Sequence, residues 1–161
     1  MGKASIADNL KVIEKIPLFQ GLSPNQVRQL LDAGQMTSFE KGHVLCREGD
    51  KSTDMYILLA GEAAVKRKDI SLATVHPVEV IGEMGLISGQ PRSAKVEVTR
   101  NATMIILNKL KFDVALKKDV DSAAKVFRNM LRTVCNRLRE ANDRLLQLEE
   151  GKSVQAADTA E

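Results

Sequence analysis

The sequence predicts an α+β domain that is mainly β, with an antiparallel β-roll or jelly roll between N-terminal helices and one long C-terminal helix. From Met36 to Leu107, short runs rich in Val, Ile and Leu are separated by turn residues at regular intervals. Apolar residues recur at helical spacing on both sides of this region. A chain of 161 residues is long enough for one such domain with an apolar core.

Residues 1–35 are predicted to form an N-terminal helical segment. From Ser5 to Ile16, apolar side chains recur every three or four residues, and Pro17 ends that pattern. Ser23 is a suitable N-cap and Pro24 a suitable first residue for a second helix.

Residues 36–108 are predicted to form the β-roll. Its strands are expected between turn signals that include Glu48-Gly49-Asp50, Ala60-Gly61 and Arg100-Asn101-Ala102. The two histidines and two cysteines of the chain lie far apart and have no metal-ligand spacing, so no metal site is expected.

Residues 81–94 combine two glycines, a carboxylate and a Pro-Arg-Ser run. Gly82 and Gly85 allow a tight turn and a close approach of the backbone to a ligand. A short helix is expected to begin near Glu83, with its free N–H groups facing a negative charge.

The side chains of this segment suit a small anion that carries a neighbouring hydroxyl. Arg92 offers a planar fork of donors for phosphate oxygens, and Ser93 adds a hydroxyl beside it. Glu83 only accepts hydrogen bonds when ionised, so it suits a sugar hydroxyl rather than a phosphate.

The run from Ile81 to Ala94 resembles the phosphate-binding cassette of the cyclic nucleotide-binding domain family. That family's pattern is roughly aromatic-Gly-Glu-x-[Ala/Gly]-Leu, followed by Pro-Arg-[Ser/Thr/Ala]-Ala. The Glu48-Gly49-Asp50 turn and the Met55–Glu62 strand resemble the family's β-roll, and the likeness extends from Leu18 to Glu150. Two features depart from it: Ile81 replaces the aromatic residue, and Pro77-Val78-Glu79 stands where Pro-Gly-Asp is frequent.

The resemblance implies that the chain binds a 3′,5′-cyclic nucleotide, with cyclic AMP favoured over cyclic GMP, and that it needs no cofactor. The ribose 2′-hydroxyl would bind Glu83, and the cyclic phosphate would bind Arg92, Ser93 and backbone N–H groups of the cassette from Gly82 to Ala94. The walls around the base would include Val65, Leu72 and Met84, and a lid residue would be Arg132, Thr133 or Arg137.

Residues 109–150 are predicted to be helical, with a short helix from Lys109 to Val114 and a long one capped by Asp121 or Ser122. Gly151 is expected to end the long helix, and residues 151–161 to form a disordered tail. Eight apolar residues of the long helix, here called the seam, alternate at spacings of three and four: Ala124, Phe127, Leu131, Val134, Leu138, Ala141, Leu145 and Leu148.

Two interpretations of the seam remain open: it covers the chain's own β-roll, or it pairs with the same helix of a second copy. The length of the helix favours a homodimer. Five arginines on this helix, Arg128, Arg132, Arg137, Arg139 and Arg144, could contact DNA, but their alternation with acidic residues favours a solvated face.

Composition and missing motifs narrow the function. The net charge of +3 is too small to indicate nucleic acid or membrane binding, and no apolar stretch is long enough to span a bilayer. The sequence shows no catalytic constellation, so an enzyme is not expected. The expected protein is a free-standing cytoplasmic sensor with reduced thiols that signals to an unidentified effector. The alternatives are a scaffold of the same fold that binds no nucleotide and, less favoured, a transcription regulator.

Overall fold

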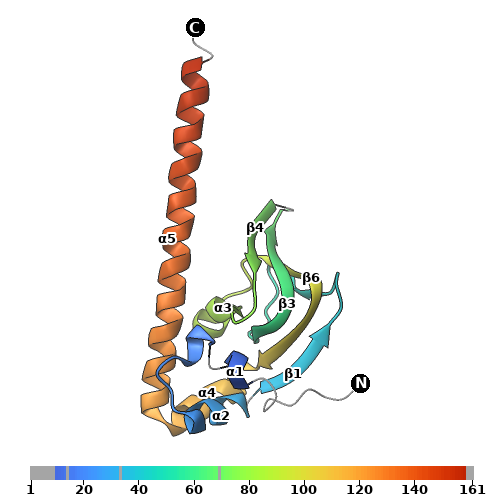
Figure 1. Ribbon diagram of the computed structural model, residues 1–161, viewed down its shortest axis with the longest axis vertical. Coiled ribbons are helices and arrows are strands. Elements are labelled where there is room, and N and C mark those ends of the chain that lie inside the picture. The colour runs from blue at the N-terminus through green and yellow to red at the C-terminus, as the bar shows by residue number, and fades with distance from the viewer. Residues whose placement is uncertain (1–9, 14, 33, 69, 159–161) are drawn as a thin grey trace.

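The computed structural model describes residues 10–158 except residues 14, 33 and 69. A curved antiparallel β-roll is flanked at one end by short helices, and a long C-terminal helix runs past the roll and extends well beyond it (Figure 1). The predicted fold class is confirmed.

Three short helical segments precede the sheet: α1 (Leu10–Ile13), the 3₁₀ turn η2 (Pro17–Phe19) and α2 (Pro24–Leu31). Ser23 caps α2 as predicted, through a reciprocal pair of bonds in which the Gln26 backbone N–H donates to the Ser23 hydroxyl and the Ser23 backbone N–H donates to the side-chain Oε1 of Gln26. The first helix was expected from Ser5 to Ile16, of which residues 5–9 lie outside the described part. It ends at Ile13, because Pro17 opens a separate 3₁₀ turn.

Six antiparallel strands form the roll, and a short helix is inserted before the last of them. The strands are β1 (Gly34–Phe39), β2 (Val44–Cys46), β3 (Met55–Arg67), β4 (Ile70–Val75), β5 (Val80–Ile81) and β6 (Lys95–Leu107). The inserted helix is α3 (Glu83–Ser88), between β5 and β6. The pairing order is β1-β6-β3-β4, with β2 also on β6 and β5 also on β3. The two long strands β3 and β6 therefore hold the roll together.

Two predicted turns lie inside these long strands. Ala60-Gly61 lies within β3 and Arg100-Asn101-Ala102 within β6, where the β3–β6 register shifts repeatedly between Leu58 and Ala63. Gly61 has φ of +93°, and a Cβ on it would overlap the Asn101 carbonyl oxygen. The turn residues produce a bulge that bends both strands instead of ending them.

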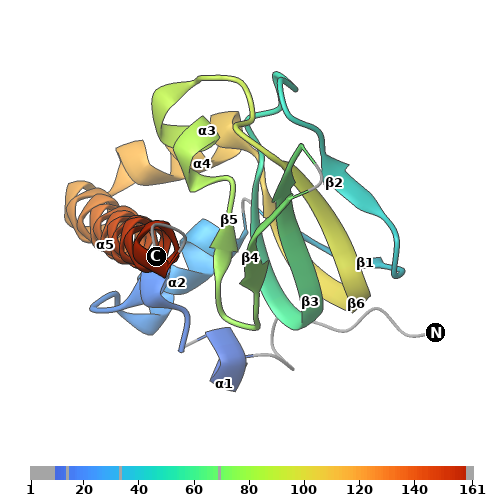
Figure 2. The ribbon, with the colours of Figure 1, turned by 90° about the horizontal axis from the view of Figure 1, so that it is seen from above.

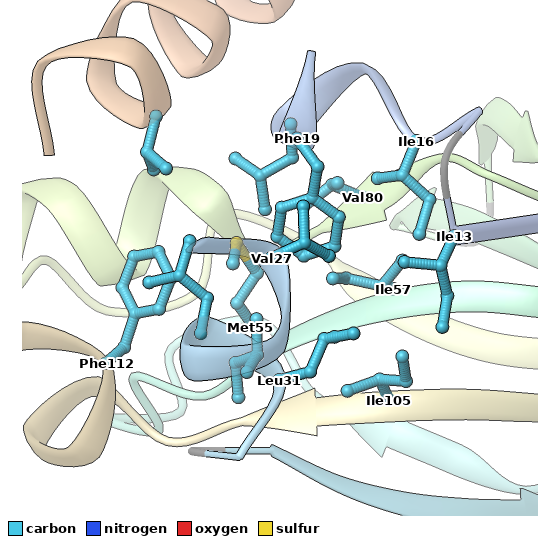
Figure 3. Close-up of a cluster of buried hydrophobic side chains, with 14 of the residues drawn as sticks. Ile13, Ile16, Phe19, Val27, Leu31, Met55, Ile57, Val80, Ile105 and Phe112 are labelled. Atoms are coloured by element: carbon cyan, nitrogen blue, oxygen red, sulfur yellow. The ribbon is translucent and has the colours of Figure 1, made fainter. Parts of the chain in front are cut away.

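The roll has two apolar cores. The larger one lies where the helices cover one end of the sheet, and Figure 3 shows Ile13, Phe19 and Phe112 converging there on Met55 and Ile57 of β3. The smaller one lies inside the roll, around Tyr56, Leu58 and Met104. The helices are therefore joined to the β-roll by continuous apolar packing.

The C-terminal helices are α4 (Lys109–Lys118) and α5 (Val120–Asp158). The predicted caps of the long helix are wrong: Asp119 is the cap, because its carboxylate accepts from the Asp121 N–H at 3.0 Å and the Ser122 hydroxyl at 2.6 Å. Gly151 does not end the helix, which continues to Asp158. An interior glycine lowers helix stability by about 1 kcal/mol. Glycines that end helices usually do so by adopting the left-handed αL backbone conformation. The predicted disordered tail is thus helical up to Asp158.

The seam does not face the β-roll. Figure 2 shows α5 end-on, lying beside the helical end of the domain. Its packed side is a different stripe, with Ser122, Val126, Asn129 and Met130 buried. The large seam residues Phe127, Leu131, Leu138, Leu145 and Leu148 are 42% to 62% exposed. The interpretation in which the seam covers the chain's own roll is therefore wrong.

The Asp119 cap predicts acid sensitivity. Hydrogen bonds from Ser122 and then Gln26 lower the pKa of the Asp119 carboxyl from 3.8 to about 2. The native state thus favours the ionised form, so this stabilisation is complete above about pH 4 and is lost as the pH falls towards 2. We expect Asp119→Asn, which keeps a capping oxygen, to lower the melting temperature at pH 7 and not at pH 2. An equal effect at both pH values in thermal unfolding by circular dichroism would contradict this role.

Candidate functional site

A pocket of about 360 Å³ opens between the β-roll, α3 and α5. One wall is apolar and comes from the roll and β5, with Val65, Val75, Val80, Ile81 and Val96. The polar part of the lining comes from residues of the segment from Gly82 to Ala94 and from Arg137 of α5. An apolar slot beside a polar loop is the usual composition of a small-molecule site.

Gly82 sets the geometry of the polar wall. It has φ of +85°, a left-handed conformation in which L side chains are strained, and it is the residue before α3. A Cβ on Gly82 would overlap Nη1 of Arg92. The glycine therefore turns the chain into α3 and leaves the space that the guanidinium fills.

Arg92 is only 6% exposed, and its guanidinium makes several contacts with the surrounding chain. Its Nη1 donates to the Gly82 carbonyl at 3.3 Å, and its Nη2 donates to the Ser52 hydroxyl at 3.2 Å and to the Asp54 carbonyl. The Tyr56 ring lies under the guanidinium, with the Cζ atom 6.0 Å from the ring centroid. Among the residues that the structure describes, no carboxylate pairs with Arg92, and these contacts stabilise its positive charge.

Glu83 lies on the same wall and is also buried. Its Oε1 accepts from Nη1 of Arg137 at 2.5 Å, and Nη2 of Arg137 donates to the Val80 carbonyl at 2.6 Å. One arginine thus joins the long helix to the start of α3 and to β5. The ion pair is half-buried, because Arg137 is 43% exposed while Glu83 is 3% exposed.

Two buried polar atoms in the pocket wall have no protein partner. Within the described residues, Glu83 Oε2 and Arg92 Nε are the buried side-chain nitrogen and oxygen atoms without a hydrogen bond. A buried acceptor or donor left unpaired costs about 1–3 kcal/mol, more when it is charged. An unpaired acceptor and an unpaired donor thus belong to two residues that line the same pocket.

Most of the predicted ligand residues meet at this pocket. Seven of them line it: Val65, Gly82, Glu83, Met84, Arg92, Ser93 and Ala94. Leu72 does not line it: its side chain is exposed on strand β4, and its carbonyl accepts from Arg144.

The other two predicted residues are on the wrong part of α5. Arg132 is exposed, and the Thr133 hydroxyl donates to the Asn129 carbonyl of its own helix. Arg137, the third alternative, reaches the pocket instead. Sequence distance from Arg92 could not separate the three, because the choice depends on the direction in which α5 crosses the roll.

Cys46 also lines the pocket and was not predicted as a site residue. Burial raises the pKa of its thiol, which lies against the Ala94 carbonyl, so the sulfur is a neutral wall atom rather than a nucleophile. Alternation along β2 and β6 could have indicated its inward orientation.

No group of three His, Cys, Asp or Glu side chains in the described part of the chain could hold a metal ion. No described helix is both long enough and apolar enough to cross a membrane.

Comparison with known families matches residues 36–119 to the model of the cyclic nucleotide-binding domain. These residues contain the roll from Met36 onward, the segment from Gly82 to Ala94 and all of α4.

Individual relatives agree with that match. A cyclic nucleotide-gated potassium channel of Mesorhizobium japonicum is 30% identical over 125 residues, which is 74% of this chain and 33% of the channel. The chain likewise spans about a third of a second such channel, from Rhizobium etli. A cyclic nucleotide-binding domain from Methylobacillus flagellatus has 30% identity and a TM-score of 0.76, over 86% of this chain and 80% of that one. The catabolite activator protein of Thermus thermophilus has 25% identity and a TM-score of 0.71, over 83% and 63%.

The Arg137–Glu83 pair predicts a coupled stability effect. Arg137→Ala would leave the buried Glu83 carboxylate without its cation, and we expect a loss of about 1–2 kcal/mol in the free energy of unfolding, reduced from fully buried pairs by the exposure of Arg137. Adding Glu83→Gln to that variant should recover part of the loss. Urea denaturation measures both, with Arg132→Ala as the exposed control. Equal losses for the two arginine variants would contradict the prediction.

Proposed function

Because this chain belongs to the cyclic nucleotide-binding domain family, we propose that its pocket binds a 3′,5′-cyclic nucleotide and favours cyclic AMP over cyclic GMP. The observation that supports this most is the pair of unpartnered buried atoms, Glu83 Oε2 and Arg92 Nε, on the polar wall of a pocket that also has an apolar wall. A cyclic nucleotide carries a hydroxyl, an anion and a flat base in one small molecule.

The cyclic phosphate is assigned to Arg92 and Ser93. The guanidinium is already fixed by its contacts with Gly82, Ser52 and Asp54, so little side-chain entropy is lost when it binds an anion. Ser93 is exposed at the pocket edge and adds a hydroxyl donor. A hydrogen bond to a charged group contributes about 1.5–3 kcal/mol.

The ribose 2′-hydroxyl is assigned to Glu83. Its Oε1 is already paired with Arg137, so Oε2 is the oxygen left to accept from the sugar. A 3′,5′-cyclic ring keeps that hydroxyl free, whereas a 2′,3′-cyclic ring blocks it. This contact would exclude the latter class.

The base is assigned to the apolar wall formed by Val65, Val75 and Val96, with Met84 at its edge. Adenine presents fewer polar groups to this wall than guanine does, and a polar group buried without a partner is costly. The aliphatic wall therefore supports the preference for cyclic AMP.

The charges at the pocket also suit a monoanion. Arg92 and Arg137 are both cationic there and Glu83 is anionic, which leaves one positive charge among these three side chains. A cyclic phosphate monoanion would bring that sum to zero.

The signal is proposed to pass through α5. A ligand bound to Glu83 touches the carboxylate that holds Arg137, and Arg144 makes a second contact from α5 to the Leu72 carbonyl. A ligand can shift the helix only if it binds the two helix positions with different affinity.

A homodimer through the seam is the proposed output. The large seam residues are exposed, while a different stripe of α5 packs on its own domain. An exposed apolar stripe at heptad spacing is the surface that a parallel or antiparallel pair of helices buries. We propose that the homodimer in turn regulates an effector protein.

Two other functions have less support. A scaffold that binds no nucleotide would have no need for a buried carboxylate and guanidinium with unpartnered atoms. A transcription regulator would use the arginines of α5 on DNA, but Arg137 and Arg144 bind the β-roll instead.

Nucleotide binding is tested by calorimetric titration with cyclic AMP and cyclic GMP. We expect saturable binding of both, tighter for cyclic AMP, and a loss of at least about tenfold, or 1.4 kcal/mol, in Arg92→Ala. Glu83→Gln should lower the affinity for cyclic AMP more than the affinity for 2′-deoxy cyclic AMP, which lacks the hydroxyl assigned to Glu83. Arg132→Ala should match the parent. A folded parent chain that binds neither nucleotide would rule out the sensor and favour the scaffold.

Dimerisation is tested by sedimentation equilibrium with a matched pair of variants. Leu138→Glu changes a seam residue, and Leu146→Glu changes a residue of equal 60% exposure that lies off the seam. We expect the first to raise the dimer dissociation constant by at least about tenfold and the second to leave it unchanged. Similar dissociation constants for the two variants would contradict the proposal that the seam is the dimer interface. A dissociation constant that is the same with and without saturating cyclic AMP would contradict coupling.

A further inference from the structure

The segment from Arg47 to Asp54, here called the strap, lies against the cassette. Its turn is closed locally, because the Asp50 carboxylate accepts from the Arg47 N–H at 2.7 Å and Gly49 has φ of +86°. At the far end, the Asp54 carboxylate accepts from the Asn108 side chain at 2.9 Å. The strap is therefore a formed element with both ends attached.

The strap binds Arg92 along its whole length. The Gly49 N–H donates to the Arg92 carbonyl and the Arg92 N–H donates to the Asp50 carbonyl, both at 2.8 Å. Further along, the Ser52 hydroxyl and the Asp54 carbonyl both accept from Nη2 of Arg92. Four hydrogen bonds thus fix the backbone and the guanidinium of one residue to one segment.

Within that set, Ser52 is the side chain on the strap that contacts the guanidinium. The other two guanidinium acceptors, at Gly82 and Asp54, are backbone carbonyls. With both Nη2 hydrogens and one Nη1 hydrogen engaged, rotation about the Nε–Cζ bond would break three bonds. The orientation of the remaining donors depends on these three hydrogen bonds, and the bond to Ser52 is the one of the three that a side-chain substitution can remove.

We propose that Ser52 is a positioning residue that orients the Arg92 guanidinium for the phosphate, through the strap. This rests on the proposed nucleotide site and deepens it. The strap contains the Glu48-Gly49-Asp50 turn, so the turn has a role at the site as well as in the chain reversal.

The binding test uses Ser52→Ala and Ser52→Thr, with Ser38→Ala as a hydroxyl control on β1, far along the chain from the strap. The probes are cyclic AMP and its two phosphorothioate diastereomers, in which sulfur replaces one or the other exocyclic phosphate oxygen. We expect Ser52→Ala to weaken cyclic AMP binding about threefold to tenfold and to change the affinity ratio of the diastereomers by about threefold. Ser52→Thr and Ser38→Ala should match the parent chain.

A double-mutant comparison separates orientation from general damage. In an Arg92→Lys background there is no guanidinium to orient, so Ser52→Ala should add less than about twofold. An equal loss in both backgrounds, or an unchanged diastereomer ratio, would overturn the proposal.

A second measurement needs no nucleotide and keeps the two proposals distinguishable. Arginine side-chain NMR of the parent should show slow rotation about Nε–Cζ of Arg92, with faster rotation in Ser52→Ala and slow rotation again in Ser52→Thr. Equal rotation rates in the parent and Ser52→Ala would overturn the positioning role. If the parent binds no nucleotide while its rotation depends on Ser52, the nucleotide site fails and the orientation by the strap stands.

Discussion

A buried guanidinium must be surrounded by acceptors, and Arg92 has them on two separate segments of the chain. The strap supplies Ser52 and the Asp54 carbonyl, and the residue before α3 supplies the Gly82 carbonyl. Desolvation of an unpaired cation would cost several kcal/mol, so these segments must come together when the chain folds. The positions of Gly82, of the start of α3 and of the strap around Arg92 meet that requirement.

The long helix is joined to this arrangement by a second arginine. Arg137 pairs with Glu83, one residue after Gly82, and so extends the polar wall from the roll to α5. The remainder of the helix is held differently, since Val126 and Met130 pack into the larger apolar core. The helix therefore has an apolar anchor near its start and a polar contact further along, and the polar contact is the one that a ligand at Glu83 could alter.

The two faces of α5 are the basis for the proposal that one helix contributes both to the ligand site and to a homodimer. The buried stripe and the exposed seam are offset around the helix, so packing on the roll leaves the seam uncovered. Burial of a large aliphatic side chain contributes about 1.5–3 kcal/mol, so burial of several of these leucines would favour the proposed homodimer. The geometry links the ligand site and the seam through the same turns of helix around Arg137 and Leu138.

Local chemistry was sufficient for much of the protein. The Ser23 cap, the alternation of apolar strands, the heptad spacing and the joint order of Gly82, Glu83 and Arg92 are properties of short segments. They were therefore enough to predict the fold class and the residues of the polar wall. Tertiary structure decided the rest. Bulges carried β3 and β6 through residues that resemble turns, because strand pairing outweighed local turn preference. The direction of α5 placed Arg137 rather than Arg132 or Thr133 at the pocket, and Leu72 lies exposed on β4, outside the pocket lining. Such choices depend on how distant segments cross, which no local pattern encodes.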